Sequence, residues 1–283
     1  MNKFLLNTKI DYITLDQSVE KIENWLKTKG KHYVVTPNPE MLVDASFDEH
    51  FQQSLNESDL AIPDSSRLGW GSYITRLKNP FLRLVLSPSF IYPHILPRFN
   101  YPKTTGVDLM ERLLSLSSEK GLTTAFLGGT PKVADNLLKC LRLKYPTLKI
   151  GFCSGNVVID TTGHMRFDTK SIKKTQSKYI KEYYDKKLTV SAHLLSERID
   201  IMFVAFGHKK QEKWMNENLP KLNTRLMVGV GGAFDYISGS VPRAPELMRN
   251  LGFEWLFRLI VQPWRIKRFW KLIYYVYMVV VSK

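Results

Sequence analysis

The sequence predicts an α/β fold in which a mostly parallel sheet carries helices on both faces. Apolar segments of strand length alternate along the chain with amphipathic segments of helix length. The strong strands, such as "TTAFLGG" (123–129) and "IDIMFVAFG" (199–207), are almost continuously apolar, which is typical of strands buried between two helical layers. With 283 residues, 44% of them hydrophobic, the chain can bury a substantial core.

The first part of the chain is expected to begin with short strands or a hairpin over residues 3–14. The segment "LDQSVEKIENWLKTKG" (15–30) carries apolar residues at helical spacing and ends at a glycine, so it predicts a helix. The segment "HYVVTPNPE" (32–40) predicts a strand that runs into a polar loop. A second helix is expected over 40–58, and a strand, a loop and a helix over 59–77.

Residues 79–102 differ from the rest because they hold five prolines. Proline blocks helix continuation and is excluded from central strands. We expect an inserted surface or membrane-facing segment without regular architecture.

From residue 104 onward the alternation is clearer. A Lys-rich stretch over 165–198 is expected to be helical and solvated. The remaining segments predict helices over 106–121, 130–146 and 208–222 and strands over 123–129, 148–156, 199–207 and 225–239, the last of which runs into a Gly-rich loop.

The chain is expected to divide into an α/β core over 1–242, which includes the 79–102 insertion, and a C-terminal appendage over 243–283. The appendage is basic and aromatic, and its arginines have the i, i+7, i+10 spacing of one helical face. Its apolar run "LIYYVYMVVV" (272–281) is too short to span a bilayer but suits a membrane interface. The alternative is an ordinary packing helix that ends a globular domain.

The formal net charge of +15 predicts attraction to polyanions such as nucleic acid, anionic lipid or phosphorylated small molecules. Two cysteines exclude a disulfide framework and a Cys-rich metal site. Residues 1–16 hold no apolar core of signal-peptide length, so we expect a cytosolic location. No DNA- or RNA-binding motif is present, which disfavours nucleic acid as the partner.

Candidate site residues follow the predicted strands, because ligands bind open α/β sheets at the carboxyl ends of the strands. Asp64 could accept a proton from a substrate hydroxyl, or could instead cap the following helix. Thr36 and Asn38 suit sugar hydroxyls, although turn structure alone also explains their loop. Gly128 and Gly129 allow backbone to approach a phosphate or sugar, or form a tight turn without a ligand.

The sequence lacks the patterns that hold common cofactors. The six histidines are not paired at metal-ligand spacing, and no pair of acids of the DxD type follows a strand. Neither a P-loop nor a dinucleotide fingerprint occurs. We expect neither a metal nor a cofactor.

Taken together, the loops resemble the WecG/TagA/CpsF glycosyltransferases (glycosyltransferase family 26) from about residue 5 to about residue 270. The resemblance is carried by "TPNPEMLVDA", "GVDL", "FLGGTPKVAD", the "KQE" of "GHKKQE", and "VGVGGAFDYISGSVPRAPELMRNLGFEWLFRLIVQPWRIKR", in this order. It implies a Rossmann-like α/β core with a C-terminal appendage. It also implies an inverting, metal-independent enzyme that transfers a sugar, expected to be N-acetylmannosamine, from a UDP donor.

The resemblance further implies an acceptor, N-acetylglucosamine linked to undecaprenyl diphosphate, used in synthesis of a cell-surface polymer such as teichoic acid, capsule or exopolysaccharide. The enzyme would attach peripherally to the cytoplasmic face of the bacterial inner membrane, and self-association is open. Asp64 matches the general base, and Gln211 an active-site amide. Thr36 and Asn38 match the polar loop beside the general base. Asp235 matches the position at which the family recognises the nucleoside. Appendage residues Arg258, Arg265 and Arg268 match the diphosphate-binding arginines.

Three positions depart from the family pattern. Ser65 stands where a glycine usually follows the aspartate, Lys209 where a proline usually precedes Lys-Gln-Glu, and Lys103 where an arginine is common. Lysine keeps the charge but loses bidentate geometry. These departures leave open a second interpretation, in which a catalytically degenerate relative serves as a scaffold in a polymer-synthesis complex.

Overall fold

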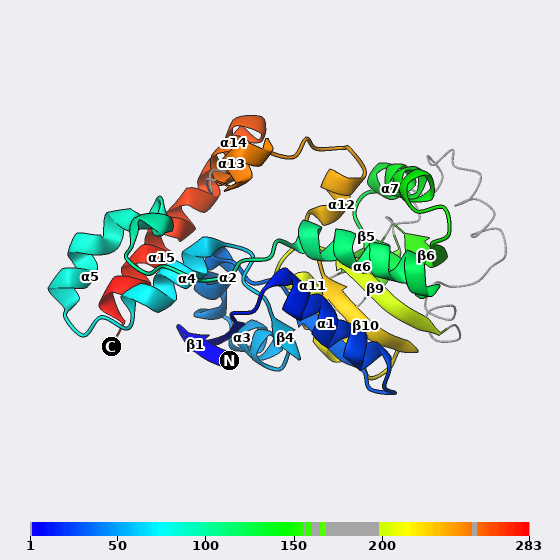
Figure 1. Cartoon of the computed structure of the whole chain (residues 1–283), viewed down its shortest axis with the longest axis horizontal. Helices are drawn as coiled ribbons and strands as arrows, with labels where there is room; N and C mark the ends of the chain where they lie inside the picture. Colours follow the sequence, from blue (N-terminus) through cyan, green and yellow to red (C-terminus); the bar gives the residue numbers. More distant parts are fainter. Residues whose placement is uncertain (1, 155–156, 160–164, 168–197, 251–253, 283) are drawn as a thin grey trace.

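The structure is a computed structural model that describes residues 2–154, 157–159, 165–167, 198–250 and 254–282. Its centre is a six-stranded parallel sheet in the order β4-β3-β10-β9-β5-β6 (Figure 1). The predicted Rossmann-like α/β fold is confirmed. The strands are β3 (His32–Val35), β4 (Leu60–Ala61), β5 (Thr123–Gly128), β6 (Lys149–Ser154), β9 (Ile199–Ala205) and β10 (Thr224–Gly229).

Helices cover both faces of this sheet, as its apolar strands predict. Alternation along β3 shows the division, since Val34 joins the core cluster on one face while Tyr33 and Val35 join the cluster on the other. The first face carries α1 (Leu15–Leu26), α6 (Gly106–Lys120), α7 (Pro131–Lys144) and α12 (Ala233–Ile237). The second face carries α2 (Pro39–Ala45), α3 (Glu49–Asn56) and α11 (Lys210–Asn218).

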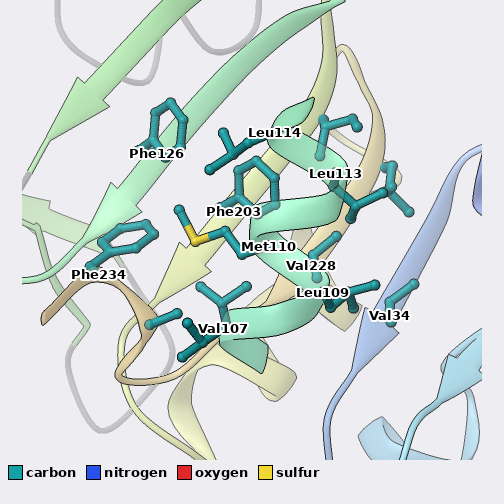
Figure 2. Close-up of a cluster of buried hydrophobic side chains, with 14 of the residues drawn as sticks. Val34, Val107, Leu109, Met110, Leu113, Leu114, Phe126, Phe203, Val228 and Phe234 are labelled. Atoms are coloured by element: carbon teal, nitrogen blue, oxygen red, sulfur yellow. The ribbon is translucent and has the colours of Figure 1, made fainter. Parts of the chain in front are cut away.

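Figure 2 shows how α6 fills the first face. Its apolar side chains, among them Val107, Met110 and Leu114, lie against Phe126 and Phe203 of the central strands. Phe126 and Phe203 stack with ring centroids 5.4 Å apart. This packing fixes the N-terminus of α6 at the carboxyl edge of the sheet, where the candidate site lies.

The expected single helix over 40–58 is wrong, because two helices occupy this segment. Asn38 begins α2 by accepting a hydrogen bond from the Met41 amide, and Asp48 begins α3 by accepting one from the Phe51 amide. The Asp48 side chain therefore satisfies a backbone donor that a continuous helix would have paired internally.

The expectation that 79–102 lacks regular structure is also wrong. The segment forms α5 (Pro80–Leu86) and two 3₁₀ helices, η1 (Ser87–Phe90) and η2 (Pro93–Ile95). Each of the three has a proline in its first two positions, where the missing N–H would be unpaired in any helix. These prolines start short helices here instead of preventing them.

A third cluster unites the two ends of the chain. Strands β1 (Asn2–Leu5) and β2 (Thr8–Asp11) form the predicted hairpin, which packs with α4 (Ser66–Ile74) and α15 (Phe269–Val281). Tyr275 and Val279 of α15 are completely buried in this cluster beside Trp70. In Figure 1, α15 lies among α2, α4 and α5, away from the sheet. The C-terminal helix is therefore part of a core, as the packing-helix alternative predicts.

The appendage arginines do not share one continuous helix. Helix α13 (Glu246–Asn250) precedes α14 (Glu254–Val261), and then a 3₁₀ helix η3 (Pro263–Arg268) separates α14 from α15. Gln262 has non-helical backbone, with φ −132° and ψ 75°, and Pro263 cannot donate the hydrogen bond that would continue α14. Arg258 lies in α14, whereas Arg265 and Arg268 lie in η3.

The prediction of a helix over 165–198 is wrong at its start, since Met165–Phe167 is strand β8, paired with β7 (Val157–Ile159). Residues 168–197 lie outside the described part of the chain. Within the described ranges, no helix has both the length and the apolar character needed to cross a bilayer.

Candidate active site

Two adjoining pockets open at the carboxyl edge of the sheet. The large pocket has a volume of about 360 Å³ and is formed by the loops after β3, β9 and β10 together with the N-terminus of α6. The small pocket, of about 180 Å³, lies between the start of α4 and the C-terminal elements α14, η3 and α15. Of the residues that the structure describes, four line both pockets and so form the wall between them: Asn38, Asp64, Thr105 and Arg268.

Asp64 is held in this shared wall by backbone contacts on both sides. Its amide donates to the Pro37 carbonyl at 2.9 Å, and its Oδ1 accepts from the Gly106 amide at 3.3 Å. The carboxylate therefore lies at the N-terminus of α6, where the helix dipole stabilises negative charge. Asp64 does not cap α4, because Ser65 does so by accepting a hydrogen bond from the Arg67 amide at 3.2 Å.

Ser65 departs from the family pattern without straining the loop. Its backbone is extended, with φ −142° and ψ 139°, a conformation open to any residue. At this position the described loop needs no glycine. The close approach occurs instead at Gly106, where an added Cβ would lie 3.1 Å from the Val230 carbonyl oxygen.

Thr36 and Asn38 both follow β3 and both line the large pocket. The buried hydroxyl of Thr36 donates to the Gly229 carbonyl at 3.1 Å, which joins the loops after β3 and β10. The Oδ1 of Asn38 is used in capping α2, so its Nδ2 is the atom that can donate to a ligand. The turn role expected for this loop is present in Asn38, and its ligand role stays a prediction.

Gln211 connects the large pocket to a buried carboxyl group. Its Oε1 accepts from the Gly231 amide at 3.2 Å, and its Nε2 donates to Glu212 Oε1 at 2.7 Å. Burial raises the pKa of Glu212 to about 7, although hydrogen bonds from Gln211 and the Lys209 amide oppose the shift. Both ends of the Gln211 amide are therefore fixed, and its orientation depends on Glu212.

Lys209 occupies a conformation that proline could not adopt. Its φ is +74°, whereas the proline ring holds φ near −65°. Its amide also donates to Glu212 Oε2 at 2.6 Å, and its Nζ lies 2.7 Å from Asp48 Oδ2. The loop before α11 therefore takes a path here that requires a residue other than proline.

His208 links the large pocket to the C-terminal helix through Asp44. The His208 Nε2 lies 2.8 Å from Asp44 Oδ2, and Lys271 Nζ donates to both Asp44 oxygens at 2.6 and 2.7 Å. Burial opposes ionisation of Asp44, but the hydrogen bonds from Lys271 and His208 outweigh it and lower its pKa. This ion-pair network fastens α15 to α2 beside the pocket.

The remaining expected site residues are divided between the pockets. Asp235, in the first turn of α12, lines the large pocket. Arg268 lines both pockets, with its Nε 3.7 Å from Glu40 Oε2. Lys103 lines the small pocket, and its Nζ donates to the Arg249 carbonyl at 3.2 Å. The side chains of Arg258 and Arg265 lie outside the described part of the structure.

Gly128 and Gly129 are not among the residues that line the large or the small pocket. Both have positive φ, of 114° and 76°, and a Cβ on Gly128 would lie 2.5 Å from the Ala205 carbonyl oxygen. This contact accounts for the glycine at 128 by packing between β5 and β9. A role in substrate binding for the pair stays a prediction.

Several pocket residues were not anticipated from the sequence. Thr105 caps α6 by accepting a hydrogen bond from the Asp108 amide, and it lines both pockets. Arg67 and Trp255 line the small pocket. The sequence offers a signal for Thr105, because a threonine before a helix is a common N-cap. It offers none for Arg67 and Trp255, which come together only through the packing of α14 against α4.

Comparison with known proteins decides the family. The model of the glycosyl transferase WecG/TagA/CpsF family matches residues 3–93 and 87–283. The chain belongs to this family. An N-acetylglucosaminyldiphosphoundecaprenol N-acetyl-beta-D-mannosaminyltransferase of Staphylococcus aureus (strain MRSA252) is 23% identical over 281 residues, covering 99% of this chain and 92% of the relative. The protein of the same name from Bacillus subtilis (strain 168) is 26% identical over 263 residues, covering 93% of this chain and 81% of the relative.

Family membership makes the chain a glycosyltransferase and gives the two pockets a chemical context. A glycosyltransferase needs a site for an activated sugar and a site for an acceptor, with the reacting atoms at their junction. Asp64 is the carboxylate that the described residues place at such a junction, since it lines both pockets.

Proposed function

We propose that the protein transfers N-acetylmannosamine from a UDP donor to N-acetylglucosamine linked to undecaprenyl diphosphate. The names of the relatives motivate the transferred sugar and the acceptor. The observation that carries the proposal is the position of Asp64 in the wall between two pockets, with its carboxylate at the N-terminus of α6. A base at this point reaches an acceptor on one side and a donor on the other.

The donor is assigned to the large pocket. This pocket presents hydrogen-bonding groups from Asn38, Asp235 and the Gly231–Gly232 backbone, which suit a nucleotide sugar. Arg268 lies at its boundary and offers a guanidinium group to the diphosphate. The nucleoside would lie toward Asp235 and the sugar toward Asp64.

The acceptor sugar is assigned to the small pocket, and the reaction is a single displacement. Asp64 takes the proton from an acceptor hydroxyl while that oxygen forms a bond to the anomeric carbon of the donor. The bond from the anomeric carbon to the diphosphate breaks, and UDP leaves with the electron pair. Attack opposite to the departing diphosphate inverts the anomeric centre.

Negative charge develops on UDP as this bond breaks, so the site must stabilise it. Fixed guanidinium donors perform this task without reorganisation at the moment of reaction. Arg268 is available for it, and Arg258 and Arg265 are retained as candidates by the family resemblance. We therefore propose that turnover needs no divalent metal.

The lipid acceptor implies that the protein works at the cytoplasmic face of the bacterial membrane, in synthesis of a cell-surface polymer. Exposed apolar side chains on neighbouring helices favour contact with a bilayer interface. Phe81 of α5 is 71% exposed, and Trp270 and Tyr277 of α15 are 74% and 57% exposed. Peripheral attachment through these helices is part of the proposal.

The test is a turnover assay with UDP-N-acetylmannosamine and an N-acetylglucosaminyl-diphospho-lipid acceptor. We expect release of UDP that requires both substrates and a disaccharide on the lipid product. Replacing the donor with UDP-N-acetylglucosamine or UDP-glucose tests the choice of sugar. UDP binding without turnover of any UDP-sugar would instead support the degenerate scaffold, and absence of both would contradict a UDP-sugar site.

A further inference from the structure

An apolar groove lies next to the small pocket. It has a volume of about 230 Å³ and is formed between η1 and the C-terminal helices α14 and α15. Its apolar walls include Phe90 and Ile91 on one side and Ile273 and Val276 of α15 on the other. Ile91 and Ile273 are 59% and 46% exposed, so the groove reaches the protein surface.

The groove is continuous with the small pocket that contains Asp64. In the described part of the chain, four residues line both cavities: Arg67, Trp255, Phe269 and Leu272. A ligand lying in the groove would therefore pass Arg67 before it reached Asp64. Helix η1, which forms one wall of the groove, is attached to α4 through Trp70. Ser89 of η1 accepts a hydrogen bond from Trp70 Nε1 at 3.0 Å, and Phe90 packs against Trp70.

Arg67 lies at this junction as a buried cation. Arg67 is 8% exposed, and its guanidinium carbon lies 5.2 Å from the Phe90 ring centroid and 5.3 Å from the Trp255 ring centroid. Among the described residues, no carboxylate forms a salt bridge with it, and its Nε has no hydrogen-bond acceptor. Burial lowers the pKa of Arg67 to about 10, so it remains charged at neutral pH.

Trp255 adds a second donor at the same junction. Its Nε1 is buried and has no acceptor within the described part of the chain. Buried donors without acceptors are costly, and a buried cation without an anion more so. The small pocket also holds carboxylates, of which Glu40 pairs with Arg268 at 3.7 Å. The buried cation and donor at the junction would therefore be satisfied by an anion, and the surface around that position is apolar.

We propose that Arg67 and this apolar groove bind the prenyl diphosphate of the acceptor lipid. The diphosphate pairs with Arg67 and Trp255 Nε1, and the first isoprene units occupy the groove between η1 and α15. The sugar attached to the diphosphate then lies in the small pocket beside Asp64. This assignment rests on the proposed function and adds to it a specific anion-binding residue and a path for the lipid.

The chemistry of the ligand matches the order of the cavities. A prenyl diphosphate joins an apolar chain directly to a multiply charged anion, and the guanidinium group presents several N–H donors to such an anion. A headgroup without an apolar chain would leave the groove unused, and a neutral lipid would leave Arg67 unpaired. The segment over 79–102 thus supplies one wall of a lipid site.

A binding experiment tests the proposal without requiring turnover. Farnesyl diphosphate is titrated into the full-length protein by calorimetry, with inorganic diphosphate and farnesol as the two half-ligands. We expect farnesyl diphosphate to bind at least about tenfold more tightly than either half-ligand, the scale of one charge-assisted contact or a few buried methylenes. Equal binding of inorganic diphosphate and farnesyl diphosphate would overturn the groove assignment.

Variants then locate the site. Arg67→Gln should weaken farnesyl diphosphate binding about tenfold or more and raise the KM for the lipid acceptor, while leaving the KM for the UDP-sugar and the affinity for UDP unchanged. For Arg67→Lys, the affinity for farnesyl diphosphate and the KM for the acceptor should lie between those of wild type and Arg67→Gln. The matched control is Arg76→Gln, another arginine over an aromatic ring, 5.6 Å from the Tyr101 centroid, outside the three cavities.

The outcomes separate this inference from the proposed function. Wild-type turnover combined with an unchanged acceptor KM in Arg67→Gln would overturn the inference alone. Farnesyl diphosphate binding that depends on Arg67, without turnover of any UDP-sugar, would overturn the proposed reaction and keep the lipid site. If Arg67→Gln does not fold, judged by circular dichroism, the comparison of the three ligands on the wild-type protein decides the question.

Discussion

Replacing Val279 by alanine tests whether the C-terminal helix belongs to the protein core. Val279 is completely buried in the cluster that also holds Leu42, Trp70 and Tyr275. The change removes two buried methyl groups and leaves a cavity, which should lower the free energy of unfolding by about 2 kcal/mol. For a chain of 283 residues, that loss corresponds to a fall in Tm of about 3 to 4 °C.

The same helix provides the control. Val281→Ala makes the same chemical change two residues away, at a side chain that is 53% exposed. Its effect on the free energy of unfolding should stay within about 0.5 kcal/mol. Urea unfolding of both variants in detergent-free buffer gives the comparison. Equal stability of Val279→Ala and Val281→Ala would refute the packing described for α15 and favour a helix that contacts lipid alone.

Two further predictions concern the active site. Glu212 has a folded-state pKa of about 7, raised from its ordinary value of 4.5. Its contribution to stability is therefore greatest below about pH 4.5 and is lost as pH rises through 7, a change of about 3 kcal/mol for this pKa difference. Glutamine cannot ionise, so Glu212→Gln should become more stable relative to wild type as the pH rises from 5 to 8. The measurement is urea unfolding of both proteins across this pH range. A stability difference that does not change with pH would contradict a buried Glu212 with a raised pKa. Because fixed cations are proposed to stabilise the departing UDP, EDTA should leave the rate of UDP release unchanged; loss of activity that added Mg²⁺ or Mn²⁺ restores would show that a metal is required.

The sheet could be predicted from the sequence because its evidence is local. Apolar runs such as 199–207 and the loops that follow them mark buried strands and their carboxyl ends without knowledge of the partners. The same reasoning placed Thr36, Asn38 and Asp64 at one edge, since the carboxyl ends of parallel strands meet there, but it also singled out Gly128 and Gly129, which do not line the large pocket. Gln211 and Asp235 were indicated by the family resemblance, and both line this pocket.

The errors arose where a local rule has two outcomes. Proline ends a helix when it lies in the interior but can begin one at the first position, and in 79–102 a proline lies at the start of each of the three short helices. Asp48 lies within an amphipathic pattern, yet its side chain starts a new helix. Periodicity alone does not distinguish these cases.

The lipid site could not be predicted, because its parts are distant in the sequence. Arg67, Phe90 and Trp255 come from three segments that meet only when α14 and α15 pack on α4 and η1. No spacing in the sequence encodes that contact. The burial of Tyr275 and Val279 likewise depends on the hairpin and α4, both from the opposite end of the chain.

The most direct test of the proposed reaction is single-turnover transfer by Asp64→Asn with saturating donor and lipid acceptor. The amide keeps the shape of the side chain in the wall between the pockets but cannot take a proton. We expect the rate to fall by about a hundredfold or more, with UDP affinity unchanged and with Asp16→Asn, an exposed carboxylate on α1, indistinguishable from wild type. Transfer by Asp64→Asn at the wild-type rate would contradict the assignment of Asp64 as the base.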